Sequence, residues 1–151
     1  MIVKKVTNND SLDILSWRND KKTIFFSAND KLVSKESHKN WLKKCLSDPK
    51  TKFYMGYLIN KNEKKKIGVV RFDIKTKYAL VSINLNPRMR GKKLSSILLS
   101  AAIKKFLRCK NIKLVAQIKN NNIASISCFL KNNFFFFKSK NQYVFFQRNL
   151  D

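Results

Sequence analysis

The stretch NPRMRGKKLSS, residues Asn86–Ser96, is the most informative feature of this chain. A run typical of a β-strand, Ala79–Leu85, precedes it, and a run typical of a helix, Leu94–Leu107, follows it. The first backbone N–H groups of a helix have no partner inside the helix, and the helix dipole makes that end partly positive. A strand, a basic turn and a helix in this order therefore favour a phosphate-binding turn, although most basic turns are only solvated loops. The rest of the sequence decides between these alternatives.

Outside this stretch, the spacing of apolar residues defines the other elements. We expect strands at 2–7, 52–59, 66–74, 78–85, 112–118, 134–137 and 143–146, and helices at 10–17, 35–46, 94–107 and 122–132. This order predicts an α/β (α+β) protein with a mixed sheet and helices on its faces. No repeat, linker or charge block divides the sequence, so residues 1–151 are expected to form one domain.

Capping residues and helical spacing refine this prediction. Asp10 and Ser34 are expected to cap the first two helices. A polar turn at 60–64 is expected to join two strands. The residues expected to face the core are Leu12, Ile14 and Leu15 on the first helix, and Leu94, Ile97, Leu98 and Ala101 on the helix after the basic turn.

The composition argues against several classes of protein. No segment has the pattern of a signal peptide, and no apolar run is long enough to cross a membrane, so we expect no membrane insertion. Cys45, Cys109 and Cys128 form no CxxC pair, and the chain has a single histidine. These counts argue against a zinc site and against a disulfide framework. We therefore expect no metal and a reducing, cytoplasmic location.

The chain is strongly basic, with 33 Lys and Arg against 9 Asp and Glu and a formal net charge of +24. Such a charge binds polyanions non-specifically. The basic residues are mostly lysine and are spread along the whole chain, whereas proteins that read nucleic acid usually show arginine-rich or aromatic-interleaved patches. A basic surface that attracts an anionic small molecule accounts for the composition better than a physiological nucleic-acid partner.

A second segment, NIASISCFLKNNF at Asn122–Phe134, indicates a family when it is combined with the basic turn. With both segments in this order, the chain resembles the GNAT superfamily of N-acetyltransferases over essentially its whole length. The resemblance implies the GNAT fold, a mixed and mostly antiparallel sheet of about six or seven strands flanked by about four helices. It also implies acetyl-CoA as a cosubstrate.

In this family the pyrophosphate of acetyl-CoA rests on a turn of pattern Arg/Gln-x-x-Gly-x-Gly/Ala. Arg90 opens the pattern here, and Lys93 and Ser95 occupy the two small positions. The Lys93 side chain either crowds the phosphate or pairs with it. The cofactor-binding residues that the resemblance implies are Asn84, Leu85, Arg90, Gly91, Lys92, Lys93, Leu94, Ser95, Asn122, Ser125 and Phe129.

The second segment matches the family pattern Asn-x-x-Ala/Ser-x-x-x-Tyr/Phe-x-x-x-Gly-Phe with two departures. Phe129 stands where many members have the tyrosine that protonates the CoA thiolate, so that role is vacant, moved elsewhere or left to water. Asn133 replaces the glycine after the helix, which is a mild change because asparagine tolerates the left-handed conformation. Asn122 is expected at the pantetheine end of the cofactor, as a helix N-cap, or as both.

Segments in the first half of the chain resemble one branch of the superfamily. They are Trp17–Asp20, Ser37–Trp41, Gly68–Asp73 and Ser82–Leu85. That branch includes enzymes that acetylate nucleotide-linked amino sugars, such as those of pseudaminic acid biosynthesis. Enzymes that acetylate ribosomal-protein N-termini are similar, though less closely.

The resemblance suggests roles around the acceptor amine. His38 and Asp73 are the candidate catalytic bases, with a packed histidine and a salt-bridged aspartate as the alternatives. Arg18 and Arg71 are candidates to grip phosphates, or else members of structural ion pairs. Trp41 lines the acceptor cleft or packs in the core. The strand Ser82–Leu85 is expected to splay from its neighbour and to offer a main-chain N–H near Leu85 to the oxyanion.

These expectations combine into one leading function. The chain is expected to transfer acetyl from acetyl-CoA to a primary amine, with an anionic nucleotide-linked amino sugar in surface-glycan synthesis as the leading acceptor. A protein of this charge attracts an anionic acceptor and repels cationic polyamines. A protein N-terminal or ribosomal-protein amine is the alternative acceptor, and a non-catalytic CoA-binding or nucleic-acid-binding domain is the alternative without chemistry.

Overall fold

The computed structural model describes residues 1–60 and 63–149 of the chain. The described strands are β1 (Ile2–Lys5), β2 (Thr51–Asn60), β3 (Glu63–Ile74), β4 (Ala79–Leu85), β5 (Leu114–Lys119), β6 (Phe135–Lys140) and β7 (Tyr143–Arg148). The α-helices are α1 (Ser11–Arg18), α2 (Lys21–Phe26), α3 (Lys35–Ser47), α4 (Leu94–Leu107) and α5 (Ile123–Leu130), with 3-10 turns at Asn8–Asp10 and Pro87–Met89.

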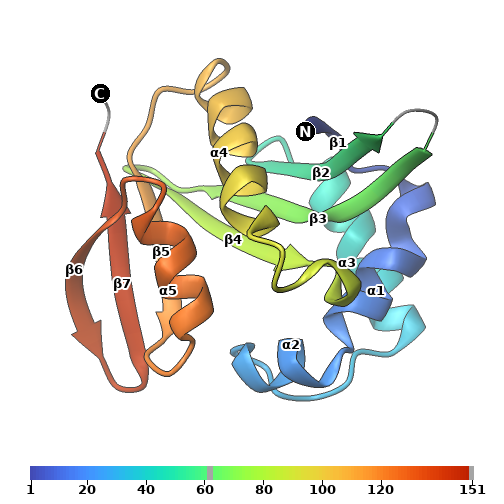
Figure 1. Ribbon diagram of the computed structural model, residues 1–151, viewed down its shortest axis with the longest axis horizontal. Coiled ribbons are helices and arrows are strands. Elements are labelled where there is room, and N and C mark those ends of the chain that lie inside the picture. The colour runs from blue at the N-terminus through green and yellow to red at the C-terminus, as the bar shows by residue number, and fades with distance from the viewer. Residues whose placement is uncertain (61–62, 150–151) are drawn as a thin grey trace.

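All seven strands form one sheet in the order β1-β2-β3-β4-β5-β7-β6. Every neighbouring pair is antiparallel except β4 and β5, which are parallel. This mixed, mostly antiparallel sheet confirms the predicted fold class. Figure 1 shows helices on both of its faces.

The sheet opens between β4 and β5, which pair only at Ala79–Leu114 and Leu80–Val115. Beyond these pairs the strands diverge into a V, and α2 lies near its open end (Figure 1). The Ala79 N–H donates to the Lys113 carbonyl, on the β5 side, at 2.8 Å. The Asn86 N–H donates to the Ile67 carbonyl, on the β3 side, also at 2.8 Å. Backbone groups alternate in direction along a strand. The N–H and C=O groups of Ile83 and Leu85 therefore face the gap, and the predicted splay of this strand is confirmed.

Two clusters of buried side chains cover the two faces of the sheet. Alternation along β2 sends Tyr54 to one face and Met55 to the other. The larger cluster joins the sheet to α4 and α5, with Phe72 and Phe106 stacked at 4.2 Å. The smaller cluster joins it to α1 and α3. The start of β4 belongs to the larger cluster through Ala79 and Val81.

Two expectations about core-facing residues are wrong, and Asp10, although it lies at the N-cap position of α1, makes no side-chain capping hydrogen bond to that helix. Leu12 was expected to face the core but is 72% exposed, because α1 turns Ile14 and Trp17 inward. The buried Asp10 at the start of α1 forms an ion pair with Lys66 at 2.8 Å, which helps to set this orientation. Ile97 is 51% exposed, because the buried stripe of α4 runs through Leu98, Leu99, Ala102, Ile103 and Phe106.

Element boundaries also differ in places. The sequence prediction missed α2, since its six residues, KKTIFF, are too few to show a helical period. β6 continues to Lys140. The expected turn at 60–64 includes residues 61 and 62, which lie outside the described residues. Asn133 adopts φ 62, as expected for the residue that replaces glycine after α5.

In the part of the chain that the structure describes, no helix is long and apolar enough to span a membrane. The same residues contain no cluster of three metal-ligating His, Cys, Asp or Glu side chains.

Candidate active site

Two cavities meet at the open part of the V. The first, of about 580 Å³, lies over α1, α3 and the middle of β3 and β4. The second, of about 420 Å³, lies between β4, the basic turn and the start of α5. Thr23, Ser27, Ile83 and Asn84 line both cavities. The splayed end of β4 and the short helix α2 thus form a wall that the two cavities share.

The basic turn is shaped by two left-handed residues. Gly91 has φ 76 and Lys93, the N-cap position of α4, has φ 58. Glycine adopts this conformation without strain, which explains its frequency at the position that Lys93 occupies here. A Cβ at Gly91 would meet no atom within 4 Å, so the main chain of the turn is open to a ligand. Gly91 and Ser95 both line the second cavity.

The start of α5 closes the other side of the second cavity. Asn122 caps the helix by accepting a hydrogen bond from the Ser125 N–H at 3.2 Å, and both residues line the cavity. The two roles expected for Asn122 are therefore compatible. At the far end of α5, the buried Asn132 donates to Ser96 Oγ at 3.0 Å, which fixes α5 against α4.

Four of the expected cofactor residues lie outside the lining of the second cavity. Phe129 is buried in the core, edge to face with Phe134 at 4.9 Å. Leu94 packs on the core as well. Lys92 and Lys93 are exposed beside the turn. Cys128 lines the cavity instead, and burial raises the pKa of its thiol although a hydrogen bond with Ser95 acts in the opposite direction.

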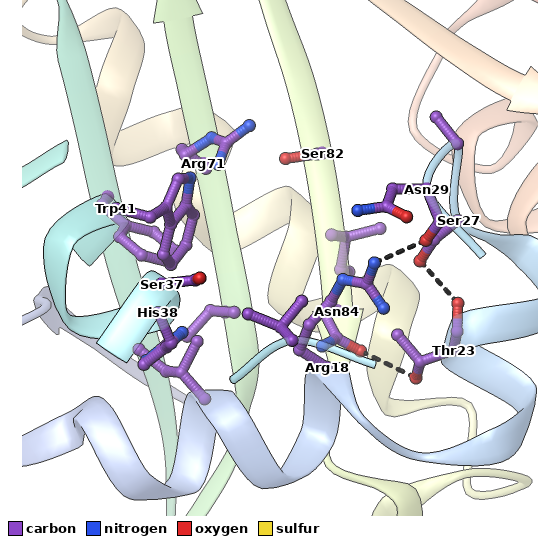
Figure 2. A pocket seen from close by; sticks show the side chains of 16 residues that line it. Arg18, Thr23, Ser27, Asn29, Ser37, His38, Trp41, Arg71, Ser82 and Asn84 are labelled. Atoms are coloured by element: carbon purple, nitrogen blue, oxygen red, sulfur yellow. Dashed lines mark hydrogen bonds between the residues drawn. The ribbon is translucent and has the colours of Figure 1, made fainter. Parts of the chain in front are cut away.

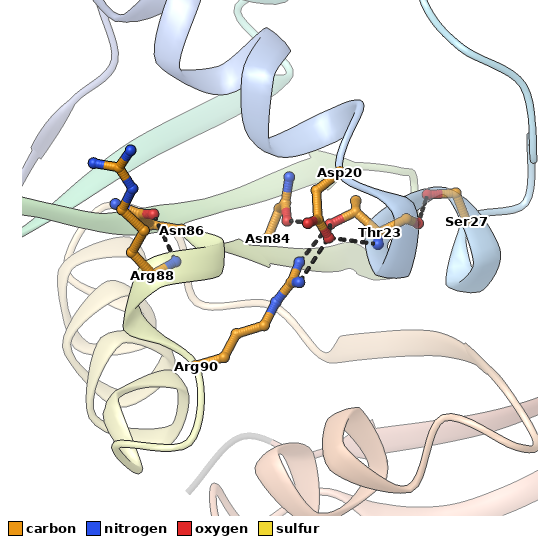
Figure 3. A network of polar contacts seen from close by, with 7 residues as sticks. All are labelled: Asp20, Thr23, Ser27, Asn84, Asn86, Arg88 and Arg90. Carbon is orange, nitrogen blue, oxygen red and sulfur yellow. Dashed lines mark hydrogen bonds and ion pairs between the residues drawn. The ribbon is translucent and has the colours of Figure 1, made fainter.

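The Arg90 side chain points across the second cavity to α2 (Figure 3). Its Nη1 lies 2.6 Å from Asp20 Oδ2, and its Nη2 donates to Thr23 Oγ1 at 2.8 Å. Burial on its own would raise the pKa of Asp20, but hydrogen bonds from Arg90 and the Thr23 N–H outweigh it and lower the pKa. Asp20 is therefore a carboxylate at neutral pH, paired with Arg90.

Arg18 and Arg71 both line the first cavity but differ in their partners. Arg18 Nη2 donates to the Asn29 carbonyl, whereas its buried Nη1 has no partner among the described residues. Arg71 is already paired, with Nη2 3.0 Å from Asp73 Oδ2 and its guanidinium over the Trp41 ring at 5.3 Å. Asp73 bonds to Arg71 and does not line the cavity.

His38, from the first turn of α3, lies on one wall of the first cavity next to Trp41, with ring centroids 5.4 Å apart (Figure 2). The residue is only 2% exposed, and its Nε2 has no partner among the described residues. Burial lowers the pKa of His38, with the Ser11 main chain acting in the opposite direction. His38 is therefore neutral at pH 7 and able to accept a proton.

This lowered pKa makes stability depend on pH in a defined direction. The unfolded chain takes up the histidine proton near pH 6.5, before the folded chain does, so stability is full above that pH and falls as the pH drops below it. The free energy of unfolding should then fall by at most about 1.4 kcal/mol per pH unit. Urea unfolding of the wild type and of His38→Gln from pH 7.5 to 5 measures it. The variant should lack this slope, and equal slopes would contradict the assignment because the chain has one histidine.

Sequence reasoning missed the contribution of α2 to the site. Lys22 and Phe26 line the second cavity, and Thr23 and Ser27 line both. One signal was available in the sequence, because aspartate is a preferred N-cap residue and Asp20 directly precedes α2. In the structure Asp20 accepts a hydrogen bond from the Thr23 N–H at 3.1 Å.

Comparison with known proteins places this chain in a family. Residues 1–134 match the family model described as the acetyltransferase (GNAT) domain. No curated protein matches the chain by sequence. Among solved structures, a domain from Methanocaldococcus jannaschii superposes with a TM-score of 0.87 at 24% identity, covering 99% of this chain and 97% of that one.

Two structures with named activities share the fold. The N-acetyltransferase PseH of Campylobacter jejuni, in complex with acetyl-CoA, has a TM-score of 0.70 at 21% identity and covers 98% of this chain and 99% of its own. The ribosomal-protein-alanine N-acetyltransferase of Brucella melitensis has a TM-score of 0.79 at 19% identity, and the match covers 99% of this chain and 100% of that one. Since the family model spans most of the sequence, this protein belongs to the GNAT acetyltransferases, which transfer the acetyl group of acetyl-CoA to an amine.

Proposed function

We propose that this enzyme acetylates the primary amine of a nucleotide-linked amino sugar in surface-glycan synthesis. The observation that carries the proposal is the charge of the first cavity. Arg18, Arg71 and the neutral His38 line it, and no Asp or Glu is among its described lining residues. A buried guanidinium nitrogen without a partner favours an anionic group such as a phosphate.

The same charge argues against the other acceptor classes. A polyamine needs carboxylates to replace its solvation, and this cavity offers arginines instead. A protein N-terminus needs no anion site, so it would leave the Arg18 Nη1 unpaired. The three cysteines are free, which agrees with a reducing cytoplasm as the place of reaction.

The second cavity has the features that acetyl-CoA requires. The N-terminus of α4 and the open main chain at Gly91 suit a pyrophosphate, with Lys92 and Lys93 at hand to balance its charge. Asn122 and Ser125 line the far side. The N–H and C=O groups of Ile83 and Leu85 face the gap and suit the amide-rich pantetheine arm.

The reaction follows from how the cavities join at β4. The acceptor amine attacks the thioester carbon, and one of the N–H groups on the gap side of β4 stabilises the oxyanion. His38 Nε2 receives the proton from the amine, which its lowered pKa permits at neutral pH. Breakdown of the tetrahedral species releases CoA thiolate. Phe129 has no proton to give, so we assign the final protonation to water.

A thiol-release assay tests the proposal with acetyl-CoA and three kinds of acceptor: nucleoside-diphosphate amino sugars, spermidine, and peptides with a free N-terminus. We expect turnover with an amino-sugar nucleotide and a steep fall of its kcat/KM with salt. Efficient acetylation of a peptide, with no amino-sugar nucleotide turned over, would favour the protein-amine alternative. CoA binding without turnover of any acceptor would favour the non-catalytic one.

Acetyl-CoA should also stabilise the protein through the basic turn. At 100 times Kd the gain is about 2.7 kcal/mol, which raises Tm by roughly 5–10 °C in a chain of this size. The double variant Lys92→Gln/Lys93→Gly removes two charges and keeps the left-handed backbone at 93. We expect it to weaken binding by about tenfold and to flatten its salt dependence. An unchanged Kd would show that the lysines do not meet the phosphates.

A further inference from the structure

We propose that the Asp20–Arg90 ion pair is a latch that holds α2 in place as the wall between the two cavities. Asp20 and Arg90 are then positioning residues for the transfer step, and the Arg90 side chain is not a phosphate ligand. The inference rests on the proposed function insofar as the two cavities hold donor and acceptor. The existence of the latch is tested separately from that function.

The helix α2 cannot hold itself in place. It has six residues, of which none is buried, so neither helix propensity nor core packing fixes it. Its attachments are polar. Arg90 binds Asp20 and Thr23 at its first turn, and Lys119, from the end of β5, donates to the Phe25 carbonyl at 2.7 Å at its last turn. The helix therefore bridges the V between side chains from its two sides.

The latch reaches the shared wall through Thr23. The Thr23 hydroxyl accepts a hydrogen bond from Arg90 Nη2 and donates one to Asn84 Oδ1, with 3.4 Å between the two oxygens (Figure 3). Asn84 lies on the splayed part of β4 and lines both cavities. A chain of hydrogen bonds thus connects the basic turn to the carboxamide at the junction of the cavities. Movement of Arg90 would release both α2 and this carboxamide.

Two features separate the latch from a phosphate site. The Arg90 guanidinium is already neutralised by a carboxylate at 2.6 Å, and moving it to a phosphate would leave Asp20 unpaired. Lys92 and Lys93 lie two and three residues on, are exposed, and form no ion pair among the described residues. The turn therefore has two other cations for a phosphate.

The chain offers matched variants for a test. Asp20→Asn removes the charge but keeps an N-cap residue for α2. Arg90→Gln removes the other charge, and Arg90→Lys retains it. Lys92→Gln makes the same change of charge in the same turn without touching the latch.

Three measurements distinguish the roles: amide exchange of peptides covering 20–27, titration with CoA, and steady-state kinetics with the amine acceptor found in the screen. We expect Asp20→Asn and Arg90→Gln to speed exchange several-fold and equally, the double variant to add nothing, and Arg90→Lys to restore most of the protection. Lys92→Gln should leave exchange unchanged. In the latch variants the Kd of CoA should stay within about threefold, while KM for the acceptor rises and kcat falls.

Other outcomes would overturn the latch. A loss of CoA affinity above tenfold in Arg90→Gln but not in Asp20→Asn would make Arg90 a phosphate ligand. Additive effects, unchanged exchange at 20–27, or unaltered acceptor kinetics would separate the pair from α2 or from the transfer step. If the wild type binds no CoA or acetylates no amine, the proposed function fails, and the exchange data alone then decide whether the ion pair holds α2.

Discussion

Arg18→Met is expected to raise KM for an amino-sugar nucleotide by about 10- to 100-fold, since a charge-assisted hydrogen bond contributes about 1.5–3 kcal/mol. The reason is the buried Nη1 that no described residue satisfies. The group binds the ground state and the transition state alike, so kcat and KM for acetyl-CoA should change little. Initial rates with each substrate varied in turn measure the effect.

Arg71→Met is the matched control, since its guanidinium is already paired with Asp73 and lies over Trp41. We expect a smaller rise of KM from this variant. Tm values of both variants identify any loss of structure. An equal effect of Arg18→Met on a peptide acceptor without phosphate would contradict an anion-binding role for Arg18.

Gly68→Ala is expected to lower Tm by about 5 °C or more and to weaken CoA binding more than tenfold. A Cβ at Gly68 would lie 2.6 Å from the Asn84 carbonyl oxygen and 2.9 Å from Leu85 Cα. These are backbone atoms of the splayed strand, so β4 itself must shift. The shift moves the N–H groups that face the gap. Thermal unfolding and calorimetric titration measure the two effects.

Gly56→Ala separates the two effects of Gly68→Ala. Its Cβ would lie 2.3 Å from Leu98 Cδ1, a side-chain atom of the core behind the sheet. We expect Gly56→Ala to lower Tm as well but to leave the Kd of CoA nearly unchanged. Equal losses of CoA affinity in both variants would show that global destabilisation, and not the displacement of β4, weakens binding.

Strong local signals explain what could be predicted from the sequence. Apolar alternation placed the described strands and four of the helices, Ser34 caps α3 as expected, and the left-handed backbone expected at Asn133 is confirmed. The splay of β4 was expected only from the family resemblance, since no pattern in a single strand reveals whether its neighbour stays alongside. The two-residue pairing with β5 confirms it.

What could not be predicted depends on contacts between distant segments. The partner of Arg90 is Asp20, seventy positions away, and nothing in the basic turn reveals that pairing. Asp73 was a candidate base, but its carboxylate accepts from Arg71 two residues earlier on the same strand. The exposure of Leu12 follows from the orientation of α1, which the buried Asp10–Lys66 pair sets from outside the helix.

The V between β4 and β5 leaves inner strand edges unpaired, in addition to the two outer edges that every open sheet has. The outer edges belong to β1 and β6, both of which carry lysines that discourage pairing with a strand of another protein. The inner edge, at Ile83 and Leu85, is apolar and lacks such charges. The helices α2 and α5 flank this edge, and Ile83 and Leu85 line the second cavity, so a ligand bound there can reach its hydrogen-bonding groups. Covering an edge with helices is one way in which proteins prevent pairing with a strand of another molecule, so this inner edge can stay unpaired without promoting aggregation.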